Sequence, residues 1–190
     1  MLLSIDTTAG TSVAVFEGQK ELSFIENADP FGHAENIGDC LTEALASAGK
    51  RIAEVTEVLV GRGPASYTGL RVGIAAAKTI AASLGVPLRG VMVLDALAYQ
   101  QPGKVLVTAD AKRRELFAAT YENGLRLDGP FLTTSEQLGQ FQDFRHLAGA
   151  SDARLNAKFF ASTSQDLSDS SPIYLRSPDV TPSKGKKVSG

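Results

Sequence analysis

The sequence contains no tryptophan, one cysteine, two histidines and two methionines in 190 residues. The single cysteine, Cys40, cannot form a disulfide within the chain and is expected to be a small core residue. The histidines, His33 and His146, are far apart, and no cysteine–histidine spacing resembles a zinc site. Lysine and arginine number 19 against 21 acidic residues, so the net charge of −2 does not favour nucleic acid or an anionic membrane as an overall partner.

Long apolar runs are also missing. The most apolar helical segment, 74–84, is interrupted by Lys78 and is too short to cross a bilayer. The start of the chain has no basic leader, and Asp6 ends its first apolar run, so no signal peptide is expected. With 43% hydrophobic and 21% charged residues, the composition is typical of a globular protein, and we expect a cytoplasmic one.

Alternating strand and helix patterns organise the first hundred residues. They occur in the order strands 2–6, 11–17 and 21–26, helix 34–48, strand 57–60, helix 66–84, strand 88–93 and a short helix beginning near Asp95. Gly49 and Gly85 are expected to end the two long helices. This β-β-β-α-β-α-β-α order predicts a mixed sheet covered by helices.

After Gln101-Pro102-Gly103 the opening pattern recurs. Strand patterns at 105–110 and 115–122 lead to the hairpin signal Asn123-Gly124, a third strand near 125–127 and, beyond a break at Gly129-Pro130, a helix beginning near Ser135. We therefore expect an N-terminal lobe at 1–100, a smaller C-terminal lobe at 103–176 and a mobile tail at 177–190.

The segment GRGPASYTGLRVG joins the strand at 57–60 to the long helix. A Walker A loop would end in Gly-Lys-Ser/Thr, but Leu70 and Arg71 follow Gly69. A Rossmann fingerprint would need a third glycine and an acidic residue about 20 positions later, and neither is present. Both phosphate-loop interpretations are weak, and the alternative is a helix N-terminal turn capped by Ser66 or Thr68.

The helix at 66–84 has small side chains along one side and an adjacent apolar stripe. A helix that is apolar over so much of its circumference is buried on more than one side. One side can face its own sheet. The other is covered either by helix 34–48 of the same chain or by a helix of another subunit, and the sequence leaves both open. If the second holds, Gly73→Leu abolishes dimerisation more readily than it unfolds the lobe.

Four segments, LLSIDTTAGTSVAVF, VLVGRGPASYTGLRVGIAAAKTIAASLGVPLRGV, DAKRREL and PIYLRSPDV, resemble the TsaB (YeaZ) family of the bacterial tRNA threonylcarbamoyladenosine pathway. Ala65 and Tyr67 stand where the family usually has glycine and phenylalanine. The resemblance implies an α/β fold with two ribonuclease-H-like lobes of the actin/sugar kinase/Hsp70 ATPase type, the second lobe being short.

The resemblance further implies a non-catalytic scaffold subunit that binds and stabilises TsaD, the transferase of the pathway. Implied partners are a TsaD homologue, the TsaE ATPase and a second copy in a homodimer, with tRNA reached indirectly through the complex and no membrane. No cofactor is implied for this chain alone, and ATP or ADP only for the complex. The catalytic relative has two metal-binding histidines, and aligned on Gly90-Val91 their places are taken here by Val93 and Leu97, which cannot bind a metal.

The candidate site residues follow from these two lines of reasoning. Partner-interface candidates are His33, Ile37, Leu41, Arg62, Gly69, Leu70, Gly73 and Ala77. Weaker nucleotide-binding candidates are Asp6, Thr7 and Thr8, because actin-like ATPases place a carboxylate there; the alternative is that Asp6 caps its turn. No residue is assigned a catalytic or metal-binding role.

Two features leave alternatives open. The adjacent basic residues Lys112, Arg113 and Arg114 are either a solvated turn or a contact for tRNA phosphate or acidic partner groups. Arg62 and Arg71 flank the glycine turn and are suited to pair with acidic groups across a subunit boundary. The alternatives to the scaffold function are a stand-alone actin-like nucleotide-dependent kinase or ATPase, and a metalloprotease.

Overall fold

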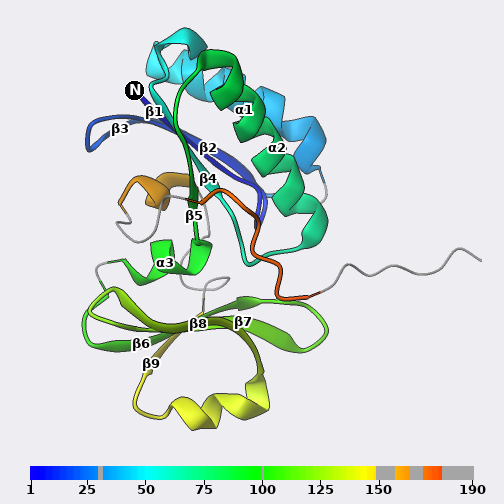
Figure 1. The fold of residues 1–190 in the computed structure, drawn as a ribbon, viewed down its shortest axis with the longest axis vertical. Coiled ribbons are helices and arrows are strands. Elements are labelled where there is room, and N and C mark those ends of the chain that lie inside the picture. Colours follow the sequence, from blue (N-terminus) through cyan, green and yellow to red (C-terminus); the bar gives the residue numbers. More distant parts are fainter. Residues whose placement is uncertain (30–31, 100, 149–156, 163–168, 177–190) are drawn as a thin grey trace, which may run out of the picture.

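The computed structural model describes residues 1–29, 32–99, 101–148, 157–162 and 169–176. These residues form two sheets, one above the other along the long axis of the molecule, with a short helix between them (Figure 1). The tail expected at 177–190 lies outside the described residues. No described helix has the length and apolar character needed to cross a membrane.

The first sheet has five strands in the order β3-β2-β1-β4-β5. Their bounds are β1 (Leu2–Asp6), β2 (Thr11–Glu17), β3 (Lys20–Asn27), β4 (Glu57–Gly61) and β5 (Leu88–Val91). The pairs β1–β2 and β2–β3 are antiparallel, whereas β4 runs parallel to β1 and β5 parallel to β4. This is the mixed sheet that the sequence predicted, in the strand order of a ribonuclease-H-like lobe.

The two faces of this sheet are covered by different elements, because successive side chains of a strand point to opposite faces. Leu3, Ile5 and Val58 contribute to the core beneath α1 (His33–Ala48) and α2 (Tyr67–Leu84), which lie on one face. On the other face, Ala14 and Phe16 pack with residues of η3 (Ala157–Ser162). The sheet is therefore a buried middle layer.

Glycine ends both long helices as expected. Gly49 after α1 and Gly85 after α2 have φ of 64° and 66°, the left-handed conformation that closes a helix. Ser66 precedes α2, but its side chain forms no capping hydrogen bond. Cys40, on α1, is 5% exposed and belongs to the core, which confirms its expected role.

The second sheet repeats the order of the first. It contains β6 (Lys104–Asp110), β7 (Glu115–Glu122), β8 (Leu125–Thr134) and β9 (Arg145–Ala148) in the order β8-β7-β6-β9, with β9 parallel to β6. This matches β3-β2-β1-β4, so the recurring pattern of the sequence corresponds to a recurring topology. The predicted fold class, α/β with two ribonuclease-H-like lobes and a short second lobe, is confirmed.

Three elements of the second lobe differ from the sequence prediction. β8 continues through Gly129-Pro130 because an irregularity in its pairing with β7 accommodates them. The helix expected near Ser135 is a 3-10 helix, η2 (Ser135–Phe141), whose start Thr134 forms a capping box with Gln137. β9 has four residues and no strand pattern of its own, so it was not expected; it pairs along β6.

Two short elements, α3 (Val93–Ala98) and η3, pack against the sheets and help to join the two lobes. All residues of α3 are buried: Leu94, Leu97 and Ala98 pack into the core of the second sheet, whereas Val93 and Ala96 pack with strands of the first sheet and with η3. At its buried Asp95, Oδ1 accepts a 2.9 Å hydrogen bond from the Tyr121 hydroxyl of β7. In η3, the backbone of Ala157 bonds to the side chains of Ser4 and Ser12 in the first sheet. The division of the chain near residue 100 stays a prediction, and residues from both sides of it contact the first sheet.

Candidate functional site

The turn between β1 and β2 is where a nucleotide was considered. Asp6 is 1% exposed; its Oδ1 accepts a 3.2 Å hydrogen bond from the Thr8 backbone N–H and its Oδ2 a 2.8 Å bond from the Thr8 hydroxyl. Burial raises the pKa of this carboxyl to about 7. The carboxylate thus stabilises its own turn, as the alternative interpretation held, and nucleotide binding by Asp6, Thr7 and Thr8 stays a prediction.

Thr7 connects this turn to α2. Its buried hydroxyl donates a 2.7 Å hydrogen bond to the Gly69 carbonyl and accepts a 3.1 Å bond from the Gly73 N–H. A Cβ atom on Gly73 would lie 2.3 Å from Thr7 Oγ1, and one on Gly69 would lie 2.7 Å from the Thr7 carbonyl oxygen. The two glycines therefore let the turn approach the helix within one lobe.

This contact corrects the predicted interface. Gly69, Leu70, Gly73 and Ala77 are all buried inside the monomer, and Leu70 and Ala77 are 0% exposed. The sequence left open whether these small side chains face helix 34–48 or a helix of another subunit; in the structure they contact the β1–β2 turn and the core of their own lobe. They are covered within the monomer. Because a Cβ on Gly73 would already lie 2.3 Å from Thr7 Oγ1, Gly73→Leu is expected to disturb the lobe itself, contrary to the expectation that it acts mainly on dimerisation.

Three other interface candidates lie on or beside α1. His33 is 6% exposed; its Nδ1 lies 3.3 Å from Thr11 Oγ1, and its ring is next to Gly69. Ile37 and Leu41 are partly buried against the core beneath α1 and α2. His33 thus helps to join the start of α1 to the β1–β2 turn, while a partner contact by Ile37 and Leu41 stays a prediction.

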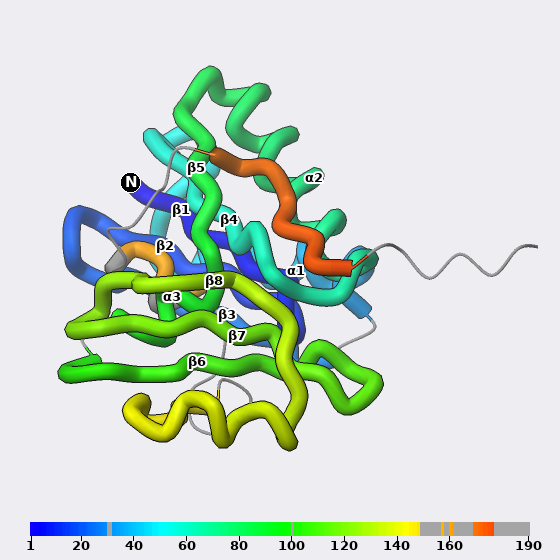
Figure 2. Tube along the Cα trace, turned by 60° about the horizontal axis from the view of Figure 1, so that its bottom comes forward, coloured from blue at the N-terminus to red at the C-terminus, as the bar shows by residue number. Residues whose placement is uncertain are grey.

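Arg62, also predicted at an interface, binds a segment of its own chain. Its Nη1 donates a 2.9 Å hydrogen bond to the Asp169 carbonyl and forms a 2.9 Å ion pair with Asp169 Oδ2. The Ile173 N–H donates a 2.7 Å bond to the Arg62 carbonyl. We call residues 169–176 the C-terminal strap; Figure 2 shows it in orange-red beside the start of α2. Arg62 therefore holds the strap, and a contact of Arg62 with another subunit stays a prediction.

The strap also binds α2 and the second sheet. Tyr174 packs on Tyr67, with ring centroids 4.9 Å apart, and its hydroxyl lies 3.2 Å from Arg71 Nε. The Arg71 guanidinium lies 3.9 Å above the Tyr67 ring. At the end of the strap, Arg176 donates a 3.0 Å hydrogen bond to the Ala111 carbonyl. Sequence analysis assigned no role to these strap residues, although PIYLRSPDV stood out as a segment; its contacts are too distant in sequence to be read from spacing.

The basic turn between β6 and β7 has an unusual backbone. Lys112, Arg113 and Arg114 have φ of 61°, 56° and 64°, a region that costs a residue other than glycine of order 1 kcal/mol or more. All three are exposed. Bonding to Lys112 lowers the pKa of the neighbouring Asp110 carboxyl. The turn is therefore a strained, cationic projection at the end of the second sheet.

The positions aligned with the histidines of the catalytic relative lie in α3. Val93 and Leu97 are 0% and 5% exposed and contribute only hydrocarbon to the cores around them. Within the part of the chain that the structure describes, no group of three or more histidine, cysteine, aspartate or glutamate side chains is placed to hold a metal ion.

Comparison with known proteins adds a second line of observation. Residues 31–156 match the family model of TsaD, described as tRNA N6-adenosine threonylcarbamoyltransferase. An uncharacterized protein of Mycobacterium tuberculosis is 32% identical, over 95% of this chain and 94% of its own. The Escherichia coli tRNA threonylcarbamoyladenosine biosynthesis protein TsaB is 32% identical over 65% of this chain. That alignment spans 57% of the E. coli protein, little more than half of its length.

A solved structure resembles the whole fold. YeaZ from Pseudomonas aeruginosa superposes with a TM-score of 0.74 at 21% sequence identity, covering 92% of this chain and 99% of that one. At this identity the likeness concerns the fold alone. It extends over both lobes.

Proposed function

The chain belongs to the TsaB family, and from that premise we propose that it is a non-catalytic scaffold subunit of the bacterial tRNA threonylcarbamoyladenosine synthase complex, where it binds and stabilises a TsaD homologue. A role in tRNA threonylcarbamoyladenosine biosynthesis follows from the relatives named for that pathway. Binding to TsaE, self-association as a homodimer and indirect contact with tRNA belong to the same proposal, as does ATP or ADP at the level of the complex.

The outward face of α1 and α2 is the observation that carries the scaffold role. The two helices lie side by side on the first sheet (Figure 1). Their exposed positions are mostly small: Ala34, Gly38, Thr42 and Ala46 on α1, and Ala75, Thr79, Ala82 and Ser83 on α2. Without bulky side chains, this face permits a close approach of helices from another subunit. It replaces the buried glycine side of α2 as the proposed interface.

Charge at the edges of this face would orient a partner. Along α1 the exposed charged residues are acidic: Glu35, Asp39 and Glu43. On α2 they are basic: Arg71 and Lys78. Opposite charges on neighbouring helices favour a partner, or a second copy, that presents the complementary pair. The TsaD match over residues 31–156 includes both helices, which is consistent with pairing between related subunits.

The non-catalytic part of the proposal is supported by Val93 and Leu97, whose hydrocarbon side chains stand at the positions of the metal-binding histidines. It is tested by assaying ATP turnover and threonylcarbamoyl transfer for the purified chain, alone and mixed with TsaD and TsaE homologues. We expect transfer only in the mixture. Substantial turnover by the chain alone would favour the kinase alternative.

Substitution on the proposed interface tests TsaD binding directly. Ala75→Arg places a long charged side chain on the outward face of α2, and we expect it to reduce co-purification of the TsaD homologue by about tenfold or more, because an unpaired charge is buried on binding. Gln140→Arg, an exposed change in η2 of the second lobe, is the matched control. If both variants retain TsaD equally while their thermal unfolding is unchanged, this face is not the interface.

A further inference from the structure

The β6–β7 turn combines positive charge with a backbone fixed in the left-handed conformation. Three successive residues other than glycine in the left-handed region persist only where their surroundings impose it, and such strain is common at functional positions. A merely solvated turn would be accommodated by glycine or asparagine without this strain. Lys112, Arg113 and Arg114 are instead all long cations, and all are exposed.

Contacts on two sides hold the turn. Asp110 Oδ1 accepts a 2.7 Å hydrogen bond from the Lys112 N–H, and its Oδ2 pairs with Lys112 Nζ at 2.7 Å. The Glu115 N–H donates to the Lys112 carbonyl and the Ala111 N–H to the Glu115 carbonyl, each at 3.0 Å. From the C-terminal strap, Arg176 bonds to the Ala111 carbonyl and pairs with Glu115. The basic side chains therefore project from a fixed base.

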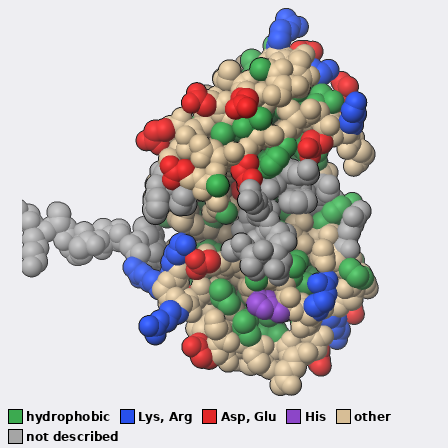
Figure 3. All heavy atoms as spheres, turned by 180° about the vertical axis from the view of Figure 1, so that it is seen from behind, with side chains coloured by type: hydrophobic (Ala, Val, Ile, Leu, Met, Phe, Trp, Pro, Cys, Tyr) green, Lys and Arg blue, Asp and Glu red, His purple; other side chains and the backbone are tan. Residues whose placement is uncertain are grey.

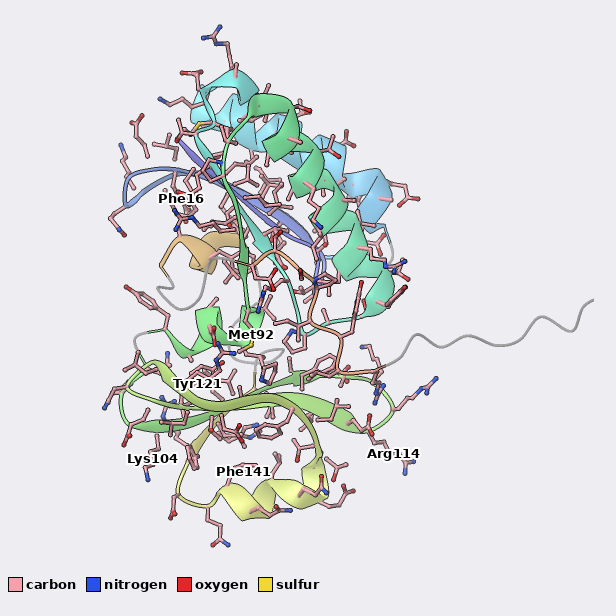
Figure 4. All side chains as sticks on the ribbon, viewed as in Figure 1. Phe16, Met92, Lys104, Arg114, Tyr121 and Phe141 are labelled. Atoms are coloured by element: carbon pink, nitrogen blue, oxygen red, sulfur yellow. The ribbon has the colours of Figure 1, made fainter. Side chains whose placement is uncertain are left out.

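The local charge is opposite to that of the molecule. Lys112, Arg113, Arg114 and Arg176 are four cations, and Asp110 and Glu115 are two carboxylates, so the turn has a net charge of +2 in a chain of −2. Figure 3 shows Lys and Arg side chains at the corresponding edge of the second lobe, and Figure 4 shows Arg114 pointing outward from it. This concentration is what a phosphate-binding surface needs, and the overall composition conceals it.

We propose that the turn formed by Lys112, Arg113 and Arg114 binds the phosphate backbone of tRNA, so that this chain itself contacts the nucleic acid of the complex. The proposal rests on the proposed function, which supplies tRNA as the partner, and it adds a direct contact to the indirect one proposed there. RNA is favoured over an acidic protein because residues 112, 113 and 114, which form the tip of the turn, are all exposed cations. The centres of protein interfaces are apolar and depleted of charge, whereas phosphates are bound by lysine and arginine through charge.

The test compares two triple variants that remove equal charge. Lys112→Ala/Arg113→Ala/Arg114→Ala removes the proposed contacts, and Lys20→Ala/Arg51→Ala/Arg145→Ala removes three exposed cations elsewhere. An unmodified tRNA transcript is titrated into the full chain, alone and with the TsaD homologue, between about 50 and 200 mM salt. We expect the first variant to bind about tenfold or more weakly and its salt dependence to fall by roughly one per lost contact. The control should match the wild type.

A third variant separates charge from folding. Glycine at positions 112, 113 and 114 removes the same charges from a backbone that glycine adopts readily, so a loss of tRNA binding shared by the alanine and glycine variants is due to charge. Thermal unfolding of each variant is recorded alongside. If the variants and the control bind tRNA like the wild type, the proposal is overturned.

Co-purification with the TsaD homologue keeps this proposal distinct from the proposed function. If the wild-type chain does not retain TsaD, the scaffold proposal fails, and titration of the chain alone still decides whether the turn binds tRNA. If the alanine variant loses TsaD while the chain alone keeps its tRNA affinity, the turn contacts an acidic protein surface and the RNA proposal is wrong. Loss of tRNA affinity with TsaD retained supports both.

Discussion

Asp6 shows how one residue changes its role with its surroundings. From the sequence it is a carboxylate in a Thr-rich turn and a weak candidate for nucleotide binding. In the structure it is buried, and its oxygens accept hydrogen bonds from Thr8. Gly61 lies so close that a Cβ there would be 2.2 Å from Asp6 Oδ1 and 3.0 Å from the Phe160 ring. The carboxyl is held among its own chain's atoms, and burial makes it favour its neutral form.

This burial predicts a pH dependence of stability. The pKa of Asp6 rises from 3.8 to about 7 on folding, so the folded chain keeps a proton that the unfolded chain releases. The contribution of Asp6 is fully present below about pH 4 and is lost as the pH rises through 7. Urea unfolding at pH 4, 6 and 8 should show the wild type losing stability relative to Asp6→Asn, by at most about 1.4 kcal/mol per pH unit.

Asp110→Asn is the control for this experiment. Bonding to Lys112 lowers the pKa of Asp110, so its contribution is present above the unfolded pKa and is lost only as the pH falls below it. Relative to this variant the wild type should be constant between pH 4 and 8. Parallel pH profiles of wild type and Asp6→Asn would show that the carboxyl of Asp6 is not perturbed by folding.

At the scale of elements, α2 illustrates why small residues need a structural explanation. The pattern of glycine and alanine indicates that something approaches the helix closely, and the sequence left helix 34–48 and a helix of another subunit as the two alternatives. The occupant is the β1–β2 turn of the same chain, through Thr7. The outward face of α2, with Ala75 and Ala82, is a different side of the helix and remains for a partner.

A pair of glycine-to-alanine changes distinguishes these environments. Gly73→Ala forces a Cβ onto the Thr7 hydroxyl, and we expect the free energy of unfolding to fall by about 1–3 kcal/mol. Gly38→Ala in α1 meets no atom within 4 Å, so we expect it to rise by about 0.5–1 kcal/mol, because alanine is the better helix former. Chemical denaturation of both variants measures the two changes. Equal stability of Gly73→Ala and wild type would contradict the close contact.

At the scale of the whole molecule, the C-terminal strap joins parts of the chain that local patterns treat separately. Arg62 from the β4–α2 loop holds Asp169, while Arg176 holds the β6–β7 turn of the second lobe. Between them Tyr174 packs on Tyr67 of α2. The strap thus links the loop before α2, one of the two proposed TsaD-binding helices, to the proposed tRNA-binding turn.

Replacing Arg62 tests this link. Its side chain is 14% exposed, and Arg62→Ala removes the hydrogen bond and ion pair to Asp169, so we expect faster hydrogen exchange in residues 169–176. Arg89→Ala removes an ion pair between Arg89 and Glu57 whose side chains are 49% and 33% exposed, and it should leave exchange in the strap unchanged. Unchanged exchange in both variants would mean that the strap is held without Arg62.

The sequence by itself determined the strands and helices of the first lobe, the two-lobe order and the family. Strand alternation, helical periodicity and glycine caps act over a few residues, so they can be recognised without the fold, as β2 at 11–17 and the Asn123-Gly124 hairpin show. In contrast, β8 runs through Gly129-Pro130 and β9 forms along β6, because pairing with a neighbouring strand decides both. Patterns that extend over only a few residues do not predict which strands pair with each other.

Only the tertiary structure decided what each candidate residue contacts. Thr7 and Gly69 are 62 positions apart, and Arg62 and Asp169 are 107 apart. Periodicity indicates that a helix face is covered, but a neighbouring turn and a second subunit leave the same pattern. The chain's own fold covers the glycine side of α2 and binds the Arg62 guanidinium, because the backbone brings distant segments within hydrogen-bond distance.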